Sequence, residues 1–511
     1  MRTTRLAATI AIVMAAGGAP CGSAVAAECG ALAGMRVADG RVIAATPVNP
    51  PFTIVSPYRS EPAEVAVPFC RVQGVLRPSE DSDIRFEVWL PPPGAWNGRY
   101  EGVGNGGFAG SLIYTGMANA LAGGYAVSAT DTGHGADGTD ARWAIGHPEK
   151  VIDFGERSIH VTAIAAKAVI AAYYGRAAER AYFSGCSDGG REALVEAERY
   201  PDDYDGIVAG APANAWVKLV TTAMWNETAL AAEPGSAIPP DKLAVISHAV
   251  HAACHATGGV VGAPEQCRFD PATLACPPGG EGGACLSRPQ IAALDKIYGG
   301  PRDAAGHPVF PGFAPGGEEG PAGWALWITG RPGQAPLQLQ FGTGFYSGMV
   351  YEDPTWTLKR FDLGPDLAAA AAKLGAVLDA TDPDLSRFRA HGGKLITYHG
   401  WYDAAIPPQN SVDFLAAVQA KNGGAAATDG FYRLFMMPGM GHCRGGPGED
   451  AIGGVFGPSA PVRDATHDVV EALARWVEQG VAPEKLVASA YAHGQPSQGV
   501  ASERVLTPYG R

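Results

Sequence analysis

The stretch AYFSGCSDGGREALVEAERY (181–200) joins an apolar run to a glycine-rich turn and then to a helical pattern. At the turn, Gly185 and Gly189 flank Ser187, with Cys186 and Asp188 between them. A serine between two glycines where a strand meets a helix is typical of a nucleophile elbow, because small neighbours let the hydroxyl project above a sheet. Ordinary glycine-rich turns contain the same letters, so this interpretation needs support from the rest of the chain.

Strand and helix patterns alternate on both sides of this stretch. Apolar residues at helical spacing predict a helix over 157–174, which Gly175 ends. The predicted strands are 84–90, 125–130, 205–212, 394–400 and 432–439, and further helices are predicted at 408–420 and 468–480. Strands that alternate with helices favour an α/β fold, with a doubly wound, mostly parallel sheet and helices on both faces.

Two polar residues follow later predicted strands. Asp403 comes after the strand over 394–400, and His442 comes after the strand over 432–439. A serine nucleophile needs a histidine base and a carboxylate that orients it, and doubly wound hydrolases carry them in the chain order Ser, Asp, His. We therefore predict that Ser187, Asp403 and His442 are the catalytic residues. The alternatives are His134, His391 or His399 as the base and Asp382 or Asp384 as the acid.

A second glycine-rich turn, GNGG (104–107), is a candidate for the oxyanion hole. We expect the backbone N–H of Asp188 and one N–H from Gly106 or Gly107 to bind the oxyanion, because closely approaching amides need residues without bulky side chains. The alternative interpretation of GNGG is a plain hairpin turn.

The middle of the chain differs from both flanking blocks. Residues 216–375 hold four cysteines, glycine- and proline-rich runs, and aromatic residues without sustained periodicity. A compact parallel sheet has no use for so long an irregular connection. We therefore expect residues 27–215 and 376–511 to form the α/β core and residues 216–375 to form an inserted domain.

Residues 1–26 are typical of an export signal. Arg2 and Arg5 precede an apolar stretch, and the small residues Ala24-Val25-Ala26 form a cleavage site. We therefore expect a secreted protein, either periplasmic or extracellular.

The cysteines outside this leader suggest disulfides. Removing Cys21 from the 9 cysteines leaves an even number, which in an exported chain predicts a disulfide framework whose connectivity is formally open. Short loops favour Cys254 with Cys267 and Cys276 with Cys285, Cys29 with Cys70 would fix the N-terminal region, and elimination leaves Cys186 with Cys443.

Composition and charge exclude several classes of protein. The chain has 51 Asp and Glu against 38 Lys and Arg, a formal net charge of −13 that repels nucleic acids and anionic membrane surfaces. Past the leader no apolar run is long enough to cross a membrane. The spacing of Cys and His does not indicate zinc. We therefore expect a small-molecule partner, without nucleic acid or membrane.

The sequence resembles the tannase and feruloyl esterase family of α/β-hydrolases, which also includes hydrolases of terephthalate mono-esters. The matching motifs are GCSDGGR (185–191), HGWYD (399–403), GHC (441–443), GNGGFAG (104–110), DTGH (131–134) and QCRFDPATLAC (266–276). The resemblance implies an α/β-hydrolase fold, a triad of Ser187, His442 and Asp403, a disulfide between Cys186 and Cys443, and a lid domain over the active site.

One departure from the family concerns calcium. Members usually carry an aspartate-rich calcium loop between the cysteines that match Cys254 and Cys267, whereas this chain has HATGGVVGAPEQ with the single acid Glu265. Calcium needs many oxygen ligands, several of them carboxylates. We expect no metal and no cofactor, and expect the two disulfide loops 254–267 and 276–285 to hold the lid without one.

The triad and the resemblance together predict a secreted serine carboxylesterase that hydrolyses feruloyl, hydroxycinnamoyl or galloyl esters through an acyl-enzyme. Candidates for an apolar acyl slot are the aromatic residues Trp324, Trp327, Phe341, Phe345, Tyr346, Trp356 and Trp401. A basic residue facing the slot, such as Arg331, would favour an acyl group with a carboxylate, and thus a terephthalate mono-ester hydrolase. A serine peptidase and a non-enzymatic binding protein are the remaining alternatives.

Overall fold

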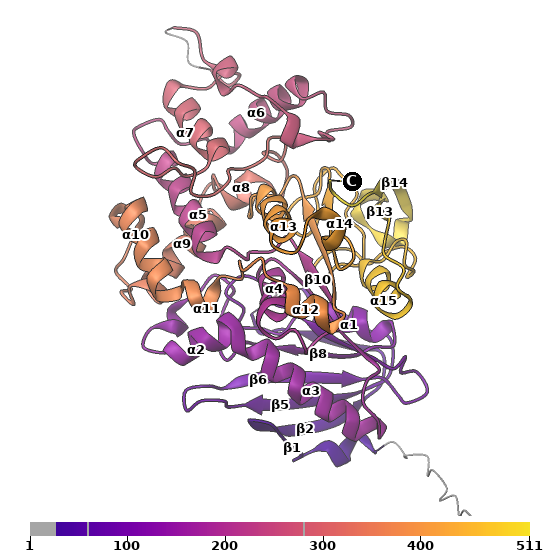
Figure 1. Ribbon diagram of the computed structural model, residues 1–511. Coiled ribbons are helices and arrows are strands. Elements are labelled where there is room, and N and C mark those ends of the chain that lie inside the picture. The colour runs from indigo at the N-terminus through magenta and orange to yellow at the C-terminus, as the bar shows by residue number, and fades with distance from the viewer. Residues whose placement is uncertain (1–26, 59–60, 279–281, 511) are drawn as a thin grey trace, which may run out of the picture.

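A large sheet forms the centre of the molecule (Figure 1). The computed structural model describes residues 27–58, 61–278 and 282–510, so the predicted export signal lies outside the described residues. The strands follow one another across the 10-stranded sheet in this order: β1 (Arg36–Val37), β2 (Gly40–Val48), β5 (Phe69–Leu76), β6 (Ile84–Leu90), β8 (Ala126–Thr130), β7 (Arg99–Val103), β9 (Arg180–Cys186), β10 (Gly206–Gly210), β11 (Lys394–Gly400), β12 (Tyr432–Met437).

The sheet has a parallel part and an antiparallel part. The strands from β8 to β12 across the sheet pair in parallel, whereas β6, β5, β2 and β1 pair antiparallel. In the parallel part Cys186 lies opposite Gly210, and Gly400 lies opposite Met437, so these four strands end at one edge. The mostly parallel, doubly wound sheet confirms the predicted α/β-hydrolase fold.

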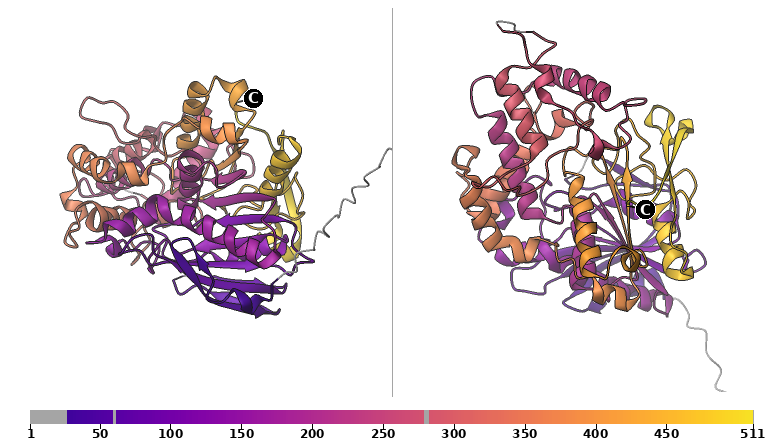
Figure 2. Two further views of the ribbon diagram at one scale, coloured as in Figure 1. Left: turned by 60° about the horizontal axis from the view of Figure 1, so that its bottom comes forward. Right: turned by 45° about the horizontal axis from the view of Figure 1, so that its top comes forward.

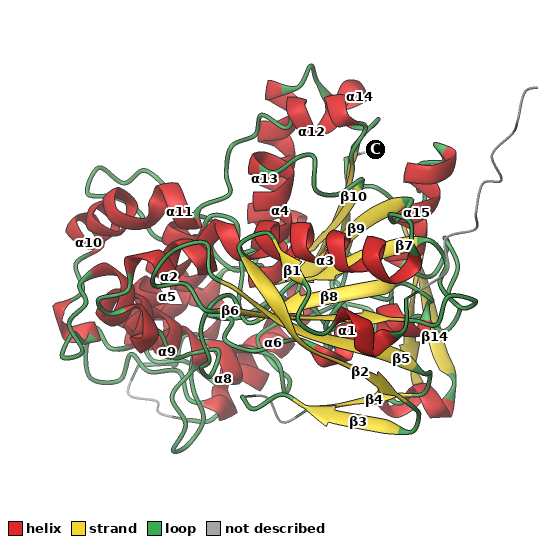
Figure 3. Ribbon diagram, turned by 90° about the horizontal axis from the view of Figure 1, so that it is seen from below, coloured by secondary structure: helices red, strands yellow, loops and turns green. Residues whose placement is uncertain are grey.

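Helices cover both faces of the sheet, and Figure 3 shows them around the twisted fan of strands. On one face a buried apolar cluster joins the strands to α3 (Ser158–Tyr174), α4 (Asp188–Arg199) and α13 (Gln409–Lys421). On the other face a second cluster joins them to α1 (Tyr114–Ala122) and α15 (Val469–Gln479). These helices have clear ends, because Gly175 after α3 and Gly480 after α15 adopt positive φ angles of 69° and 70°.

The segment between β10 and β11 combines helices with long loops, such as 300–323. Its helices are α5 (Trp216–Leu230), α6 (Pro240–Ala253), α7 (Arg288–Gly299), α8 (Trp324–Trp327), α9 (Leu337–Gly344), α10 (Leu363–Ala370), α11 (Ala376–Leu378) and α12 (Ser386–His391). We call residues 216–375 the inserted segment. Since β10 and β11 are paired neighbours, the segment leaves the sheet and returns beside the same point. Figures 1 and 2 show most of its helices gathered on one side of the sheet. Its assignment as a separate domain stays a prediction.

Small elements complete the structure. Two hairpins stand outside the large sheet, β3 (Phe52–Val55) with β4 (Pro62–Val65) and β13 (Leu486–Tyr491) with β14 (Val500–Leu506). The short helices α2 (Pro148–Ile152) and α14 (Ala425–Thr428) lie in connections. Within the described residues, no helix has both the length and the apolar character that a bilayer crossing requires.

Candidate active site

Ser187 stands at the sharp turn between β9 and α4. Its backbone adopts φ 67° and ψ −122°, a conformation that costs free energy for any residue other than glycine. The turn needs glycine on both sides. A Cβ at Gly185 would lie 2.2 Å from the carbonyl oxygen of Gly189, and a Cβ at Gly189 would lie 2.8 Å from the carbonyl oxygen of Asn105. The glycines thus let the helix start directly against the strand, with Ser187 at the carboxyl edge of the sheet.

The side chains of Ser187, His442 and Asp403 form one chain of hydrogen bonds. His442 Nε2 lies 2.9 Å from Ser187 Oγ, and His442 Nδ1 lies 2.7 Å from Asp403 Oδ2. Asp403 follows β11 and His442 follows β12, so the ends of β9, β11 and β12 at one edge of the sheet bring together residues that are far apart in sequence. This geometry allows His442 to take the Ser187 proton while Asp403 holds the other ring nitrogen.

The Asp403 carboxylate is buried and saturated with hydrogen-bond donors. Its Oδ1 accepts from the backbone N–H groups of Ala405 (2.7 Å) and Ile406 (2.9 Å). Burial by itself raises the pKa of Asp403, but the charge of His442 and the hydrogen bonds from His442 and the neighbouring His399 outweigh it and hold the pKa well below its usual range. Asp403 is therefore ionised at every pH at which the protein is expected to work.

Four disulfides form, in the pairs that the cysteine spacing suggests: Cys29–Cys70, Cys186–Cys443, Cys254–Cys267 and Cys276–Cys285. The Cys186–Cys443 bond joins the residue before Ser187 to the residue after His442, with 6.1 Å between the two Cα atoms. It ties the elbow to the loop that carries His442.

The two turns proposed for the oxyanion hole meet beside Ser187. Asp188 is the first residue of α4, and Gly106 and Gly107 lie on the facing loop. The helix holds that loop: the N–H of Gly189 donates to the carbonyl oxygen of Asn105 (2.9 Å), and the N–H of Asn105 donates to Glu192 Oε2 (2.8 Å). Burial, then the charge of Asp188, hold the pKa of Glu192 well above its usual range.

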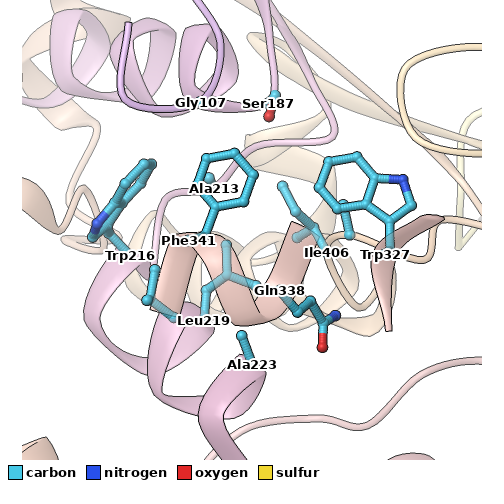
Figure 4. Close-up of a pocket in the computed structure, with 12 residues that line it drawn as sticks. Gly107, Ser187, Ala213, Trp216, Leu219, Ala223, Trp327, Gln338, Phe341 and Ile406 are labelled. Atoms are coloured by element: carbon cyan, nitrogen blue, oxygen red, sulfur yellow. The ribbon is translucent and has the colours of Figure 1, made fainter. Parts of the chain in front are cut away.

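Ser187 faces two hollows. The first, which we call the inner pocket, has Ser187 and Gly107 on one side and Leu219, Ala223 and Gln338 on the other (Figure 4). Its remaining lining residues are Ala213, Trp216, Val220, Trp327, Phe341, Ala405 and Ile406. Apart from Ser187, the polar groups among these side chains are the Gln338 amide and the indole N–H groups of Trp216 and Trp327.

The second hollow, the outer cleft, shares Gly107, Ser187, Trp327 and Phe341 with the inner pocket. It is also lined by Gly106, Gly138, Thr139, Ala322, Leu326, Leu337, His442, Cys443, Arg444 and Phe456. The ring of Trp327 packs edge-on against His442, with 5.1 Å between the ring centres. His442 thus lines the outer cleft and does not line the inner pocket.

Comparison with known proteins identifies the family. The family described as "Tannase and feruloyl esterase" matches residues 70–510. The chain belongs to the tannase and feruloyl esterase family. An uncharacterized esterase of Xanthomonas campestris pv. campestris is 42% identical over 472 residues, which cover 86% of this chain and 81% of that protein. A probable feruloyl esterase B-2 of Aspergillus terreus is 33% identical over 442 residues, which cover 85% of this chain and 81% of that protein.

A solved structure supports the family assignment. The crystal structure of feruloyl esterase B from Aspergillus oryzae has a TM-score of 0.85 at 26% identity and covers 93% of this chain and 94% of its own. This member of the tannase and feruloyl esterase family is thus a carboxylic ester hydrolase.

The alternative acids and bases of this esterase are engaged elsewhere. His134 Nε2 bonds to the carbonyl oxygen of Phe108, and His391 pairs with Asp202. Asp384 pairs with Lys421, and the backbone N–H of Asp382 donates to Glu198. His399 is the exception, because it bonds to Asp403 itself.

The residues proposed for the acyl slot of this esterase fall into two groups. Trp327 and Phe341 line the inner pocket. Buried instead in apolar clusters are Trp324, Phe345, Tyr346, Trp356 and Trp401. The guanidinium of Arg331 donates to the carbonyl oxygen of Pro321 and is exposed, and Arg331 does not line the inner pocket.

Several pocket residues of this esterase were missed from the sequence. Trp216, Leu219, Val220 and Ala223 all belong to α5, and Gln338 belongs to α9. The signal for α5 was available, because the helix begins soon after β10, at the same edge of the sheet as Ser187. No signal of that kind marks Gln338.

The loop that holds calcium in other family members lacks the necessary carboxylates in this esterase. Between Cys254 and Cys267 the chain supplies one carboxylate, Glu265. The described residues also contain no group of three or more His, Cys, Asp or Glu side chains arranged to hold a metal. The loop is held by protein contacts instead: the N–H of Val261 donates to Tyr402 Oη (2.8 Å), and Tyr402 Oη donates to the carbonyl oxygen of Gly259 (3.1 Å).

Proposed function

We propose that this chain is a serine esterase that hydrolyses esters of aromatic acids, with Ser187 as nucleophile, His442 as general base and acid, and Asp403 as the orienting carboxylate. The continuous hydrogen bonds from Ser187 Oγ through His442 to Asp403 are the observation that supports it most. The names of two relatives, a probable feruloyl esterase and feruloyl esterase B, support an aromatic acid as the acyl group.

The reaction follows from these positions. His442 Nε2 takes the proton of Ser187 Oγ as this oxygen attacks the ester carbonyl carbon. The N–H groups of Asp188 and of Gly106 or Gly107 stabilise the oxyanion that forms. His442 then gives the proton to the alcohol oxygen, the C–O bond breaks, and an acyl-enzyme remains. Water, activated by the same histidine, attacks the acyl-enzyme and releases the acid.

The position of His442 indicates which hollow takes the alcohol part of the ester and which takes the acyl group. Since His442 must protonate the leaving alcohol, the alcohol part of the ester lies in the outer cleft, which His442 lines. The acyl group then occupies the inner pocket, which Ser187 also lines. There its aromatic ring meets Trp216, Phe341 and the aliphatic side chains of α5.

The chemistry of the inner pocket ranks the candidate acids. None of the described residues that line it is charged, so the free carboxylate of a terephthalate mono-ester would be buried there without a cation. The pocket also offers few polar groups to the three hydroxyls of gallate: both ends of the Gln338 amide are already bonded, to Asn226 and to the carbonyl oxygen of Ala404, which leaves the indole N–H of Trp216 as a donor. We therefore favour feruloyl and related hydroxycinnamoyl esters.

Three further assignments belong to this proposal. The inserted segment acts as a lid domain, because α5 and α9 supply one wall of the inner pocket. The leader and the disulfides support secretion to the periplasm or the exterior. Catalysis uses no cofactor, since each step has a protein group to carry it.

The test is hydrolysis of methyl ferulate, methyl gallate, chlorogenate and a terephthalate mono-ester by the wild type and by Ser187→Ala. We expect kcat/KM to be highest for the two hydroxycinnamoyl esters, and expect the variant to lose at least about a thousandfold in rate. A folded Ser187→Ala variant that keeps its activity would exclude Ser187 as the nucleophile. A preference for the terephthalate ester would overturn the acyl assignment but not the triad.

A further inference from the structure

His399 contacts the same carboxylate oxygen as His442. It lies near the end of β11 and is completely buried. Its Nε2 is 3.1 Å from Asp403 Oδ2 and 3.3 Å from the carbonyl oxygen of Ile406. Its Nδ1 is 2.7 Å from the Ser411 hydroxyl on α13. Both ring nitrogens are thus occupied by groups other than Ser187, so His399 is no substitute for the base.

These partners assign the proton on the His399 ring. A carboxylate oxygen and a carbonyl oxygen both accept and do not donate, so the hydrogen must sit on Nε2. In the neutral ring Nδ1 is then an acceptor, and the Ser411 hydroxyl donates to it. The two contacts on opposite sides fix the ring between α13 and the Asp403 loop.

With His399 included, Asp403 receives four hydrogen bonds. Oδ1 accepts from two backbone N–H groups, and Oδ2 accepts from the imidazoles of His442 and His399. A carboxylate has about four lone-pair positions, so this one is fully occupied. It cannot turn about its Cβ–Cγ bond without breaking bonds on both oxygens.

We propose that His399 is a positioning residue for ester hydrolysis, whose Nε2–H holds Asp403 Oδ2 in the plane that His442 Nδ1 requires. The inference rests on the triad proposed above. Removing this donor leaves the buried Oδ2 with one partner, and an unmet hydrogen bond is costly there. The carboxylate then has one restraint fewer, and His442 is held less firmly in line with Ser187 Oγ. His399 touches no substrate, since it lines neither hollow.

The experiment compares His399→Leu with His399→Gln on methyl ferulate. Leucine fills the space but donates nothing, whereas the Gln amide nitrogen reaches the position of Nε2 and donates to Asp403. We expect His399→Leu to lower kcat roughly tenfold to a hundredfold with KM unchanged, and His399→Gln to restore most of kcat. In proton NMR, the far-downfield signal of the His442 Nδ1–H proton is expected to move upfield in His399→Leu and to stay near its wild-type position in His399→Gln.

Ser187→Ala is assayed beside both variants. If it stays active, the triad fails and the inference fails with it. If it is inactive while a folded His399→Leu keeps wild-type kcat, only the inference is overturned. Equal losses in the Leu and Gln variants, or a change confined to KM, also overturn it. Should His399→Leu not fold, His399→Asn takes its place, because its shorter amide stops short of Asp403; it is expected to lose the same activity, and wild-type kcat in it overturns the inference.

Discussion

The carboxyl edge of the sheet and the inserted segment hold their side chains in different ways. At the edge, Ser187, His442 and Asp403 are fixed by hydrogen bonds, by strand ends and by the Cys186–Cys443 bond. In the inserted segment, the residues that face Ser187 are mostly apolar side chains of α5 and α9, held by packing. The edge is therefore built for one geometry, whereas the segment tolerates exchange of side chains of similar volume.

The largest expected difference between the two regions is the effect on kcat and stability of removing a disulfide from each. Replacing Cys186 and Cys443 together by Ala should lower kcat at least about tenfold and reduce the free energy of unfolding by about 2–5 kcal/mol, because the bond closes a long loop next to the catalytic groups. Steady-state assays and urea unfolding measure the two effects.

The matched control is the double replacement of Cys276 and Cys285 by Ala. The disulfide between these two residues closes a loop of only 9 positions in the inserted segment. This double replacement should leave kcat unchanged and cost less stability. If both double variants lose kcat alike, the contrast between the regions does not hold.

Replacing Trp327 by Ala tests the packed side of the site. Its ring lines both hollows and touches His442, so we expect kcat/KM for methyl ferulate to fall about tenfold, a loss of roughly 1.4 kcal/mol in transition-state binding. Trp225→Ala is the control, since Trp225 lies on α5 but lines neither hollow. Equal effects of the two changes would mean that the segment acts through its stability and not through contact with substrate.

Buried acids occur in both regions, Glu101 in the sheet and Glu227 and Glu318 in the inserted segment, and Glu101 allows a prediction for the pH dependence of stability. Burial raises the pKa of Glu101 on β7 to about 7 from an ordinary value of 4.5, against the hydrogen bond from Ser184. Between these two pH values the unfolded chain binds fewer protons than the folded one, so the free energy of unfolding falls as pH rises.

Glu101→Gln removes this titration. The variant should match the wild type near pH 4 and exceed it above pH 7 by on the order of 1–3 kcal/mol, as measured by urea unfolding across this range. Other buried acids act on both proteins equally. Parallel pH curves for the two proteins would show that Glu101 is ionised in the folded state.

The smallest expected effect is that of a chelator. Since the 254–267 loop offers one carboxylate and is held by Tyr402, we expect EDTA to change neither the melting temperature nor kcat, and expect added calcium to do nothing. Elemental analysis of the purified protein provides the independent check. Stoichiometric calcium, or a melting temperature that falls with EDTA, would contradict this and make the segment a metal-stabilised region.

The sequence was most informative where local pattern and tertiary role agree. The strands β6, β9, β11 and β12 were predicted because most of their residues are apolar or alternate between apolar and polar. β7 was not predicted, because RYEGV carries two charged residues that the fold neutralises: Arg99 pairs with Glu471 and Glu478, and Glu101 bonds to Ser184. Such partners come from distant parts of the chain, so a local window does not reveal them.

The same limit explains why the triad residues could be predicted from the sequence and the pocket residues could not. Chain order and strand ends were enough to select Ser187, Asp403 and His442, which the structure brings within hydrogen-bond distance. The pocket residues depend on which face of a helix turns toward Ser187. Aromatic residues such as Trp324 and Tyr346 fill the core of the inserted segment, whereas the small side chain of Ala223 reaches the pocket. Composition alone does not encode that orientation.

The Cys186–Cys443 bond also bears on when in its lifetime the enzyme is expected to become active. Ser187 and His442 are 255 positions apart, and one covalent bond beside both of them forms only under oxidising conditions. A chain still in a reducing compartment carries two free thiols there and is expected to be a weak esterase. If the chain is exported as proposed, oxidation after export would complete the enzyme, and production for study would call for an oxidising host.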